Sequence, residues 1–282
     1  MDNFRRTFIK SSLLGTFMSS IAGVDFLTHR FTDSSKEYHD ESDRYPALKL
    51  ELIREVVGAS HGNLEKVKEL VGMRPELANA TWDWGWGDIE TALGAAGHMG
   101  RRDIAEYLIS KGARQDLFSY VILGQVEVVQ TIIEANPGIQ SIAGPHGITV
   151  MQHARNRFRR SDSMDAKEIA DMKTMISYLE SLGDADAKPP RQSLTDEEKE
   201  IYIGEYRYGE GERDVLVVSL NMRKMMSVAR KGEFGKAMYK VGDHTFGLES
   251  SPSVRLSFTI ADDQAMAVKL IEPGLDLIAN RI

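Results

Sequence analysis

Apolar residues recur at helical spacing in short segments between residues 47 and 185. The first segment carries Leu48, Leu52, Val56 and Ala59, and a Gly-Asn pair separates it from the next. Residues three or four positions apart share one face of an α-helix, so each segment predicts a short helix with one apolar stripe. A single helix cannot bury such a stripe alone, and we therefore expect the helices to stack.

The pairing of helical segments recurs along the chain, with Gly62, Gly100 and Gly124 between the two members of successive pairs. The intervals are unequal but close to the period of a helix-pair repeat. The stretch TALGAA at residues 91–96, with a Gly-Ala pair after the second helix, resembles an ankyrin repeat. The stretch TVMQHA at residues 149–154 resembles the opening of another.

The ankyrin resemblance implies an all-α helical solenoid of about four degenerate repeats over residues 47–185. It also implies protein binding, because helical solenoids present an extended concave surface. The sequence departs from the family pattern at Gly94 and Gln152, where a His is usual, and in a polar insertion at residues 159–166. These departures weaken any transfer of a binding mode from regular arrays.

The hydrophobic pattern changes after a Pro-containing linker at residues 186–194. Over residues 195–282, short alternating segments separated by Gly, Asp and Asn predict an antiparallel β barrel or half-barrel. Its opening YIGEY stretch at residues 202–206 resembles the lipocalin-like C-terminal module of beta-lactamase-related serine hydrolases. The predicted fold class is therefore α+β with two domains, an ankyrin-type solenoid followed by this small β domain.

The N-terminal segment resembles a twin-arginine export signal, which has a paired arginine, a Phe and a Lys before a weakly apolar run. The matching residues are Arg5, Arg6, Phe8 and Lys10. We expect a signal peptide over residues 1–22 and a polar tether over residues 23–46. The resemblance implies a bacterial protein that is periplasmic or otherwise extracytoplasmic, with no stable membrane span after cleavage. A cytoplasmic protein is the alternative.

Composition excludes several classes of chemistry. The chain has 282 residues and a formal net charge of -7, which argues against a nucleic-acid partner. It has no Cys, so thiol catalysis, disulfides and Cys-zinc sites are excluded. Its seven His residues lie apart in the sequence and match no metal motif, so we predict no metal site and no cofactor. His61 and His98 occupy equivalent helix ends and are interpreted as turn residues bonded to the backbone.

The stretch Gly58–Gly62 matches the G-x-S-x-G pattern of a serine-hydrolase nucleophile elbow, with Ser60 at its centre. That elbow requires a strand before the Ser, whereas a helix is predicted there. We therefore predict that the protein is not an enzyme and keep a serine hydrolase as a minor alternative.

One basic cluster follows the last predicted repeat opening, and its arginines are Arg155, Arg157, Arg159 and Arg160. It could bind an anionic surface such as an envelope lipid or glycan. The alternative is a solvated helix end whose charge is balanced by the acidic residues that follow.

All three tryptophans lie in the connection between the first two helix pairs. In an extended strand, alternate residues share a face, so we expect one aromatic surface flanked by carboxylates. The candidate binding residues are Trp82, Asp83, Trp84, Trp86, Asp88 and Glu90. Such a surface suits a protein, a cationic peptide or a sugar. Alternatively, the tryptophans seal the N-terminal end of the helical stack.

Taken together, these features predict an exported, non-enzymatic binding protein that engages a protein partner through the solenoid and its tryptophan-bearing connection. The alternative is binding of a small ligand or glycan by the C-terminal β domain, with the solenoid as a docking module.

Overall fold

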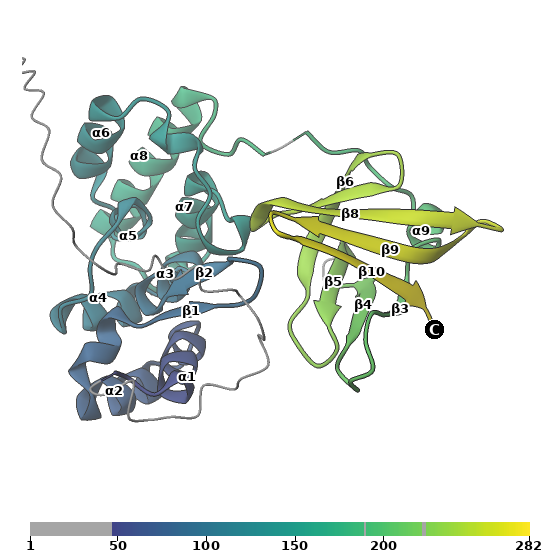
Figure 1. Ribbon diagram of the computed structural model, residues 1–282. Coiled ribbons are helices and arrows are strands. Elements are labelled where there is room, and N and C mark those ends of the chain that lie inside the picture. The colour runs from purple at the N-terminus through teal and green to yellow at the C-terminus, as the bar shows by residue number, and fades with distance from the viewer. Residues whose placement is uncertain (1–46, 189, 222–223) are drawn as a thin grey trace, which may run out of the picture. The chain divides into compact units, whose positions relative to one another are not determined.

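The computed structural model describes residues 47–188, 190–221 and 224–282 (Figure 1). The predicted signal peptide and tether, including Arg5, Arg6, Phe8 and Lys10, lie outside these ranges. Within them, no helix combines the length and apolar character that crossing a membrane requires.

The N-terminal part of the described chain is built from short helices that pack in sequential pairs. The apolar stripes predicted from the sequence are buried, as Val56, Leu70, Ile104 and Leu108 show. The helices are α1 (Leu50–Ser60), α2 (Leu64–Met73), α3 (Ala92–His98), α4 (Arg102–Ser110), α5 (Leu117–Ile122), α6 (Val126–Ala135), α7 (Val150–Phe158) and α8 (Ala166–Leu182).

Side chains at the helix ends account for several of the helix boundaries. Thr91 begins α3, because its Oγ1 accepts a hydrogen bond from the Gly94 amide at 2.8 Å. Asp165 and Glu168 form a reciprocal capping box at the start of α8. Gly183 ends the same helix in a left-handed conformation with φ of +82°.

The helices do not form a repeat solenoid, so this part of the predicted fold class is wrong. Each pair packs internally, and α1, α3, α5 and α7 contact one another in turn. However, the connections between pairs share no common unit. A β hairpin precedes α3, a short loop precedes α5, and the 3-10 helices η3 (Ile139–Ser141) and η4 (Pro145–Gly147) precede α7. The second helix of the last pair, α8, has 17 residues, whereas α2 and α6 have 10.

The hairpin before α3 contains all three tryptophans, and we call residues 81–91 the finger. Its strands are β1 (Thr81–Asp83) and β2 (Ile89–Thr91), with Trp82 opposite Glu90. Between the strands, Gly85, Trp86 and Gly87 all have positive φ.

The C-terminal strands form a closed antiparallel barrel in the order β10-β3-β4-β5-β6-β7-β8-β9. The alternation predicted strands correctly, but the half-barrel alternative is wrong, since β10 also pairs with β3. The short helix α9 (Asp196–Glu200) precedes the barrel. The strands are β3 (Gly204–Arg207), β4 (Val215–Leu220), β5 (Met226–Arg230), β6 (Lys236–Gly242), β7 (Thr245–Leu248), β8 (Ser251–Ala261), β9 (Gln264–Glu272) and β10 (Leu275–Arg281).

Aromatic side chains fill much of the barrel core. Tyr202, Phe246 and Phe258 contact one another edge to face, with ring centroids 4.8–5.5 Å apart. Arg281 donates to the Tyr206 hydroxyl at 3.1 Å and to the Ile203 carbonyl at 2.6 Å. The contacts of Arg281 tie the last strand to the start of the barrel.

Candidate metal centre

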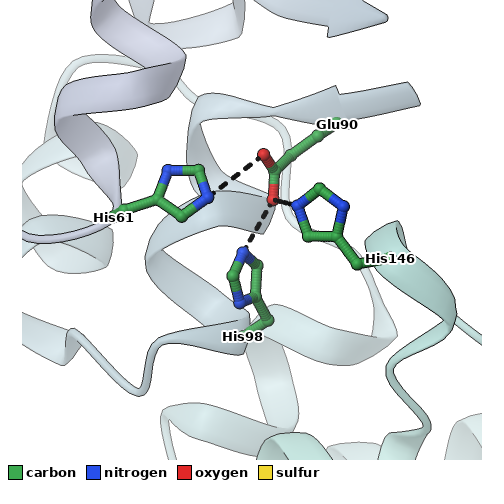
Figure 2. A group of neighbouring side chains, drawn as sticks. All are labelled: His61, Glu90, His98 and His146. Atoms are coloured by element: carbon green, nitrogen blue, oxygen red, sulfur yellow. Dashed lines mark ion pairs between the residues drawn. The ribbon is translucent and has the colours of Figure 1, made fainter. Parts of the chain in front are cut away.

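Four side chains from separate segments converge on one point in the helical part of the molecule. They are His61, Glu90, His98 and His146, each of which can offer one ligand atom, and these atoms lie within 4.8 Å of one another. Figure 2 shows the three imidazoles arranged around the Glu90 carboxylate.

Local structure explains how each side chain reaches this point. His61 caps the C-terminus of α1, His98 is the last residue of α3, and Glu90 lies on β2 of the finger. His146 lies in η4 with φ of +59°, a conformation that costs free energy for a residue with a Cβ. Such backbone strain is typical of functional sites.

The contact between His98 and Glu90 is close but is not a hydrogen bond. His98 Nε2 lies 2.9 Å from Glu90 Oε1, yet neither of these buried atoms has a hydrogen-bond partner in the described structure. His146 Nε2 lies 3.5 Å from the same oxygen, and His61 Nε2 lies 3.5 Å from Glu90 Oε2. Two ligands of a tetrahedral ion with bonds of about 2.0 Å lie about 3.3 Å apart, so these spacings suit donors that share an ion.

Contacts on the far side of two imidazoles leave their Nε2 atoms directed at the centre. His61 Nδ1 lies 3.1 Å from the Val57 carbonyl oxygen, and His146 Nδ1 lies 2.7 Å from Asp88 Oδ2. Metal-bound histidines use the same arrangement, in which the other ring nitrogen is held by a carbonyl or a carboxylate.

The carboxylate of Glu90 is held as well. Trp84 Nε1 donates a hydrogen bond of 2.7 Å to Glu90 Oε2. That bond occupies one oxygen of the carboxylate and orients the other toward His98. Trp84 therefore acts on the centre as a positioning residue.

In the metal-free protein, burial and neighbouring charges set the protonation states of Glu90, His98 and His146. Burial alone would raise the pKa of Glu90, but contacts with His146 and His98 outweigh it and lower the pKa to about 2. Burial alone would lower the pKa of His146, but Asp88 and Glu90 outweigh it and raise the pKa to about 9. Burial lowers the pKa of His98 despite Glu90. Near pH 7, an imidazolium at His146 therefore faces two carboxylates.

One side of the centre is open to solvent. The side chains of Glu90 and His98 are 0% and 6% exposed, whereas those of His61 and His146 are 29% and 31% exposed. An ion can therefore reach the donors from the side of His61 and His146. Three imidazole nitrogens and a carboxylate oxygen suit Zn²⁺ and similar transition metals, while Ca²⁺ and Mg²⁺ prefer oxygen ligands.

The expected common face of the tryptophans does not form. Trp82 and Trp84 pack against the helical core, while Trp86 packs against the barrel core. The guanidinium of Arg54 lies 5.9 Å from the Trp82 ring centroid. The side-chain alternation of β1 ends at Asp83, because the positive φ of Gly85, Trp86 and Gly87 turns the chain.

The finger carboxylates also differ from the expected rim of a binding surface. Asp88 and Glu90 are buried, and only Asp83 is exposed. Asp83 Oδ1 accepts a hydrogen bond of 2.8 Å from the Gly85 amide and so stabilises the turn. A sugar or peptide therefore has no direct access to the carboxylates of Asp88 and Glu90.

The four arginines of the basic cluster contact different intramolecular partners. Arg157 is buried beside Glu168, at 3.4 Å. The other three arginines have partners as well, among them Asp186 for Arg155 at 3.0 Å, Asn156 for Arg159 at 2.9 Å and the Met99 carbonyl oxygen for Arg160 at 2.9 Å. This arrangement gives no support to a shared anion site.

Ser60 does not lie in a nucleophile elbow. It is a buried residue of α1, and its Oγ donates to the Val56 carbonyl at 2.7 Å. This bond satisfies the hydroxyl within its own helix, so the hydrolase alternative gains no support from this residue. The described structure neither supports nor excludes another enzymatic activity.

Sequence reasoning did not bring the four donors of the candidate metal centre together, because they come from separate segments. Glu90 was predicted as a finger carboxylate, and His61 and His98 were interpreted as backbone-bonded turn residues. The Nδ1 of His61 does bond to the backbone, but its Nε2 faces Glu90. The equivalent positions of His61 and His98 were the available signal, and nothing in the sequence pointed to His146.

No known family model, curated protein or solved structure matches the chain. The ankyrin, twin-arginine and lipocalin-like resemblances, the extracytoplasmic location and the protein partner therefore stay predictions. The fold and the His-Glu cluster define the molecule as a helical region and a closed β-barrel with a candidate metal centre beside the finger.

Proposed function

We propose that the protein binds one divalent transition-metal ion, with Zn²⁺ the best fit, through the Nε2 atoms of His61, His98 and His146 and a carboxylate oxygen of Glu90. The proposal is carried by the convergence of these four donors from separate segments. Their number and type match a four-coordinate Zn²⁺ site.

A metal-free cluster of ion pairs is the competing interpretation, and two observations favour the metal. In an ion-pair cluster, His98 Nε2 and Glu90 Oε1 would align as a hydrogen bond, because leaving both buried atoms unpaired costs free energy. They are 2.9 Å apart without that alignment. The contacts of Nδ1 in His61 and His146 also leave Nε2 as the nitrogen that faces the centre, where a metal ion would displace any proton that it carries.

The bound ion would connect four segments that are separated from one another along the chain. It would hold the end of α1, the end of α3, the finger and η4 at one point. Because binding to the native state raises its stability, the metal would act at least as a structural clamp on the helical region.

Metal titration tests this proposal directly. Chelator-treated full-length protein is titrated with Co²⁺, followed by visible absorption, and then with Zn²⁺ in competition. We expect one ion per chain, with the intense d–d bands of a tetrahedral Co²⁺ site, which Zn²⁺ abolishes. The absence of stoichiometric binding would contradict the proposal.

Substitutions assign the site. We expect His98→Gln and the more exposed His61→Gln each to weaken Co²⁺ binding by about 100-fold or more, since each removes a ligand. His153→Gln is the matched control, because His153 is also buried but lies outside the four donors. Trp84→Phe should keep all four ligands and weaken binding about tenfold by freeing Glu90. Unchanged binding and spectra in both ligand variants would place the ion elsewhere.

A further inference from the structure

A second feature, independent of the metal donors, is a cavity of about 200 Å³ next to the finger. Trp84 and Trp86 line one side of the cavity. Apolar barrel residues also line it, among them Leu216 and Leu270 from the barrel core and Leu277 on β10. The cavity is partly open, so a small molecule can enter without the barrel opening.

An exposed aromatic ring lies at this cavity. Phe234 lines it, is 78% exposed, and meets Trp84 edge to face with centroids 6.3 Å apart. Exposing a whole phenyl ring to water is unfavourable, and a ligand in the cavity would cover part of the Phe234 ring.

The finger keeps Trp86 beside the cavity in a conformation that costs free energy. Trp86 has φ of +55°, a left-handed conformation that is unfavourable for a residue with a Cβ. Its carbonyl oxygen accepts a 2.5 Å hydrogen bond from Ser251 Oγ, and its ring packs against the barrel core. The wall formed by Trp86 is therefore anchored at both its backbone and its side chain.

The charged residues that line the cavity are paired with residues that do not line it. Arg230 pairs with Asp214 at 2.9 Å, Glu233 pairs with Arg213 at 2.9 Å, and Lys236 pairs with the buried Asp88. A charged ligand would have to compete with these pairs. The lining therefore favours a ligand without charge.

We propose that this cavity binds a small uncharged aromatic molecule of one substituted ring, between the finger tryptophans and the barrel leucines. The size supports this class, because an apolar cavity of about 150 Å³ is enough for benzene. The proposal does not rest on the metal centre, although Trp84 lies at both sites.

The test uses 4-fluorotoluene and ¹⁹F NMR on the full-length protein. We expect saturable binding with a Kd on the order of 1 mM or below. Leu277→Trp should fill the cavity and weaken binding about tenfold or more. Ile278→Trp is the matched control, because Ile278 is the next residue on β10, is exposed and does not line the cavity. It should bind as the wild type does.

A second pair of variants avoids any change in the core. Phe234→Ala removes an exposed ring and should weaken binding about threefold, whereas Met266→Ala, also exposed but outside the cavity, should not. Repeating the titration after chelator treatment separates this site from the metal centre. The proposal is overturned if the wild type shows no saturable binding, or if Leu277→Trp binds as tightly as Ile278→Trp. Tighter binding of 4-fluorobenzoate than of 4-fluorotoluene would overturn the uncharged class.

Discussion

At the scale of single residues, Glu90 shows how a buried charge is kept ionised. Its carboxylate is inaccessible to solvent, and an isolated charge there would be strongly unfavourable. The imidazoles of His146 and His98 and the indole N–H of Trp84 replace water around it. A metal ion would supply a larger positive charge at the same place, which is why this carboxylate suits a ligand.

The raised pKa of His146 predicts how the stability of the metal-free protein depends on pH. Its folded pKa of about 9 exceeds the ordinary value of 6.5, so its stabilising effect is complete below pH 6.5 and disappears as the pH rises through 9. We expect the free energy of unfolding to fall by about 1–3 kcal/mol between pH 7 and pH 10. Chemical denaturation in the presence of chelator measures this fall. His146→Gln should flatten the profile, and a wild-type profile that is already flat would contradict the assignment.

At the scale of elements, the finger determines where three similar residues act. A continuous strand would have placed the three indoles on one face, but β1 ends after three residues. The turn that follows sends Trp84 to Glu90 and Trp86 to the barrel, while Trp82 stays with the helices. The turn after β1 thus places the three tryptophans of one short sequence motif in three different environments.

The turns that end the helices make a prediction at the same scale. Gly100 has φ of +64°, and a Cβ there would lie 2.7 Å from the Asn156 carbonyl oxygen and 2.9 Å from the Arg157 Cα. We expect Gly100→Ala to destabilise the protein by about 3 kcal/mol or more, because backbone strain and a backbone clash add. Gly112→Ala is the control: Gly112 has φ of +90° but open space around it, and should cost about 1–2 kcal/mol. Denaturant unfolding compares the two, and equal effects would contradict the close approach of α7.

At the scale of the whole molecule, the finger joins the helical and β regions, which belong to one compact unit, Leu48–Ile282. Asp88 is the central contact. It accepts hydrogen bonds from the His146 amide at 2.8 Å and from the ammonium of Lys236 on β6. The same carboxylate orients His146, so the contact with the barrel and the geometry of the candidate metal centre share one residue.

Removing the barrel side of this contact gives a prediction for the whole molecule. Lys236 and Asp88 are both buried, so Lys236→Met should cost about 3 kcal/mol of unfolding free energy by leaving a buried carboxylate short of one partner. Lys231→Met removes a lysine from an exposed pair with Glu205 and should cost less than about 1 kcal/mol. Thermal and denaturant unfolding measure both variants. A cost for Lys236→Met no larger than that of the control would mean that the contact does not stabilise the fold.

Local patterns of apolar and polar residues were enough to predict most of the helices and strands. The apolar stripe that includes Val56 predicted a short helix. The alternating pattern of the segment Val215–Leu220 predicted a strand. These patterns are local, because the period of 3.6 or 2 decides which residues share a face. Glycine turns and capping residues such as Thr91 are local as well, and they mark the boundaries in the same way.

The way in which the helices and strands combine depends on contacts between residues that are distant in the chain. The pairing of β10 with β3 closes the barrel, and the unequal connections prevent a repeat solenoid; neither follows from a local period. The candidate metal centre depends on four segments meeting at Glu90. The left-handed turn at Trp86 ends the strand alternation that the sequence of the finger suggests. Residues far apart in the chain become neighbours only through packing, which no single stretch of sequence encodes.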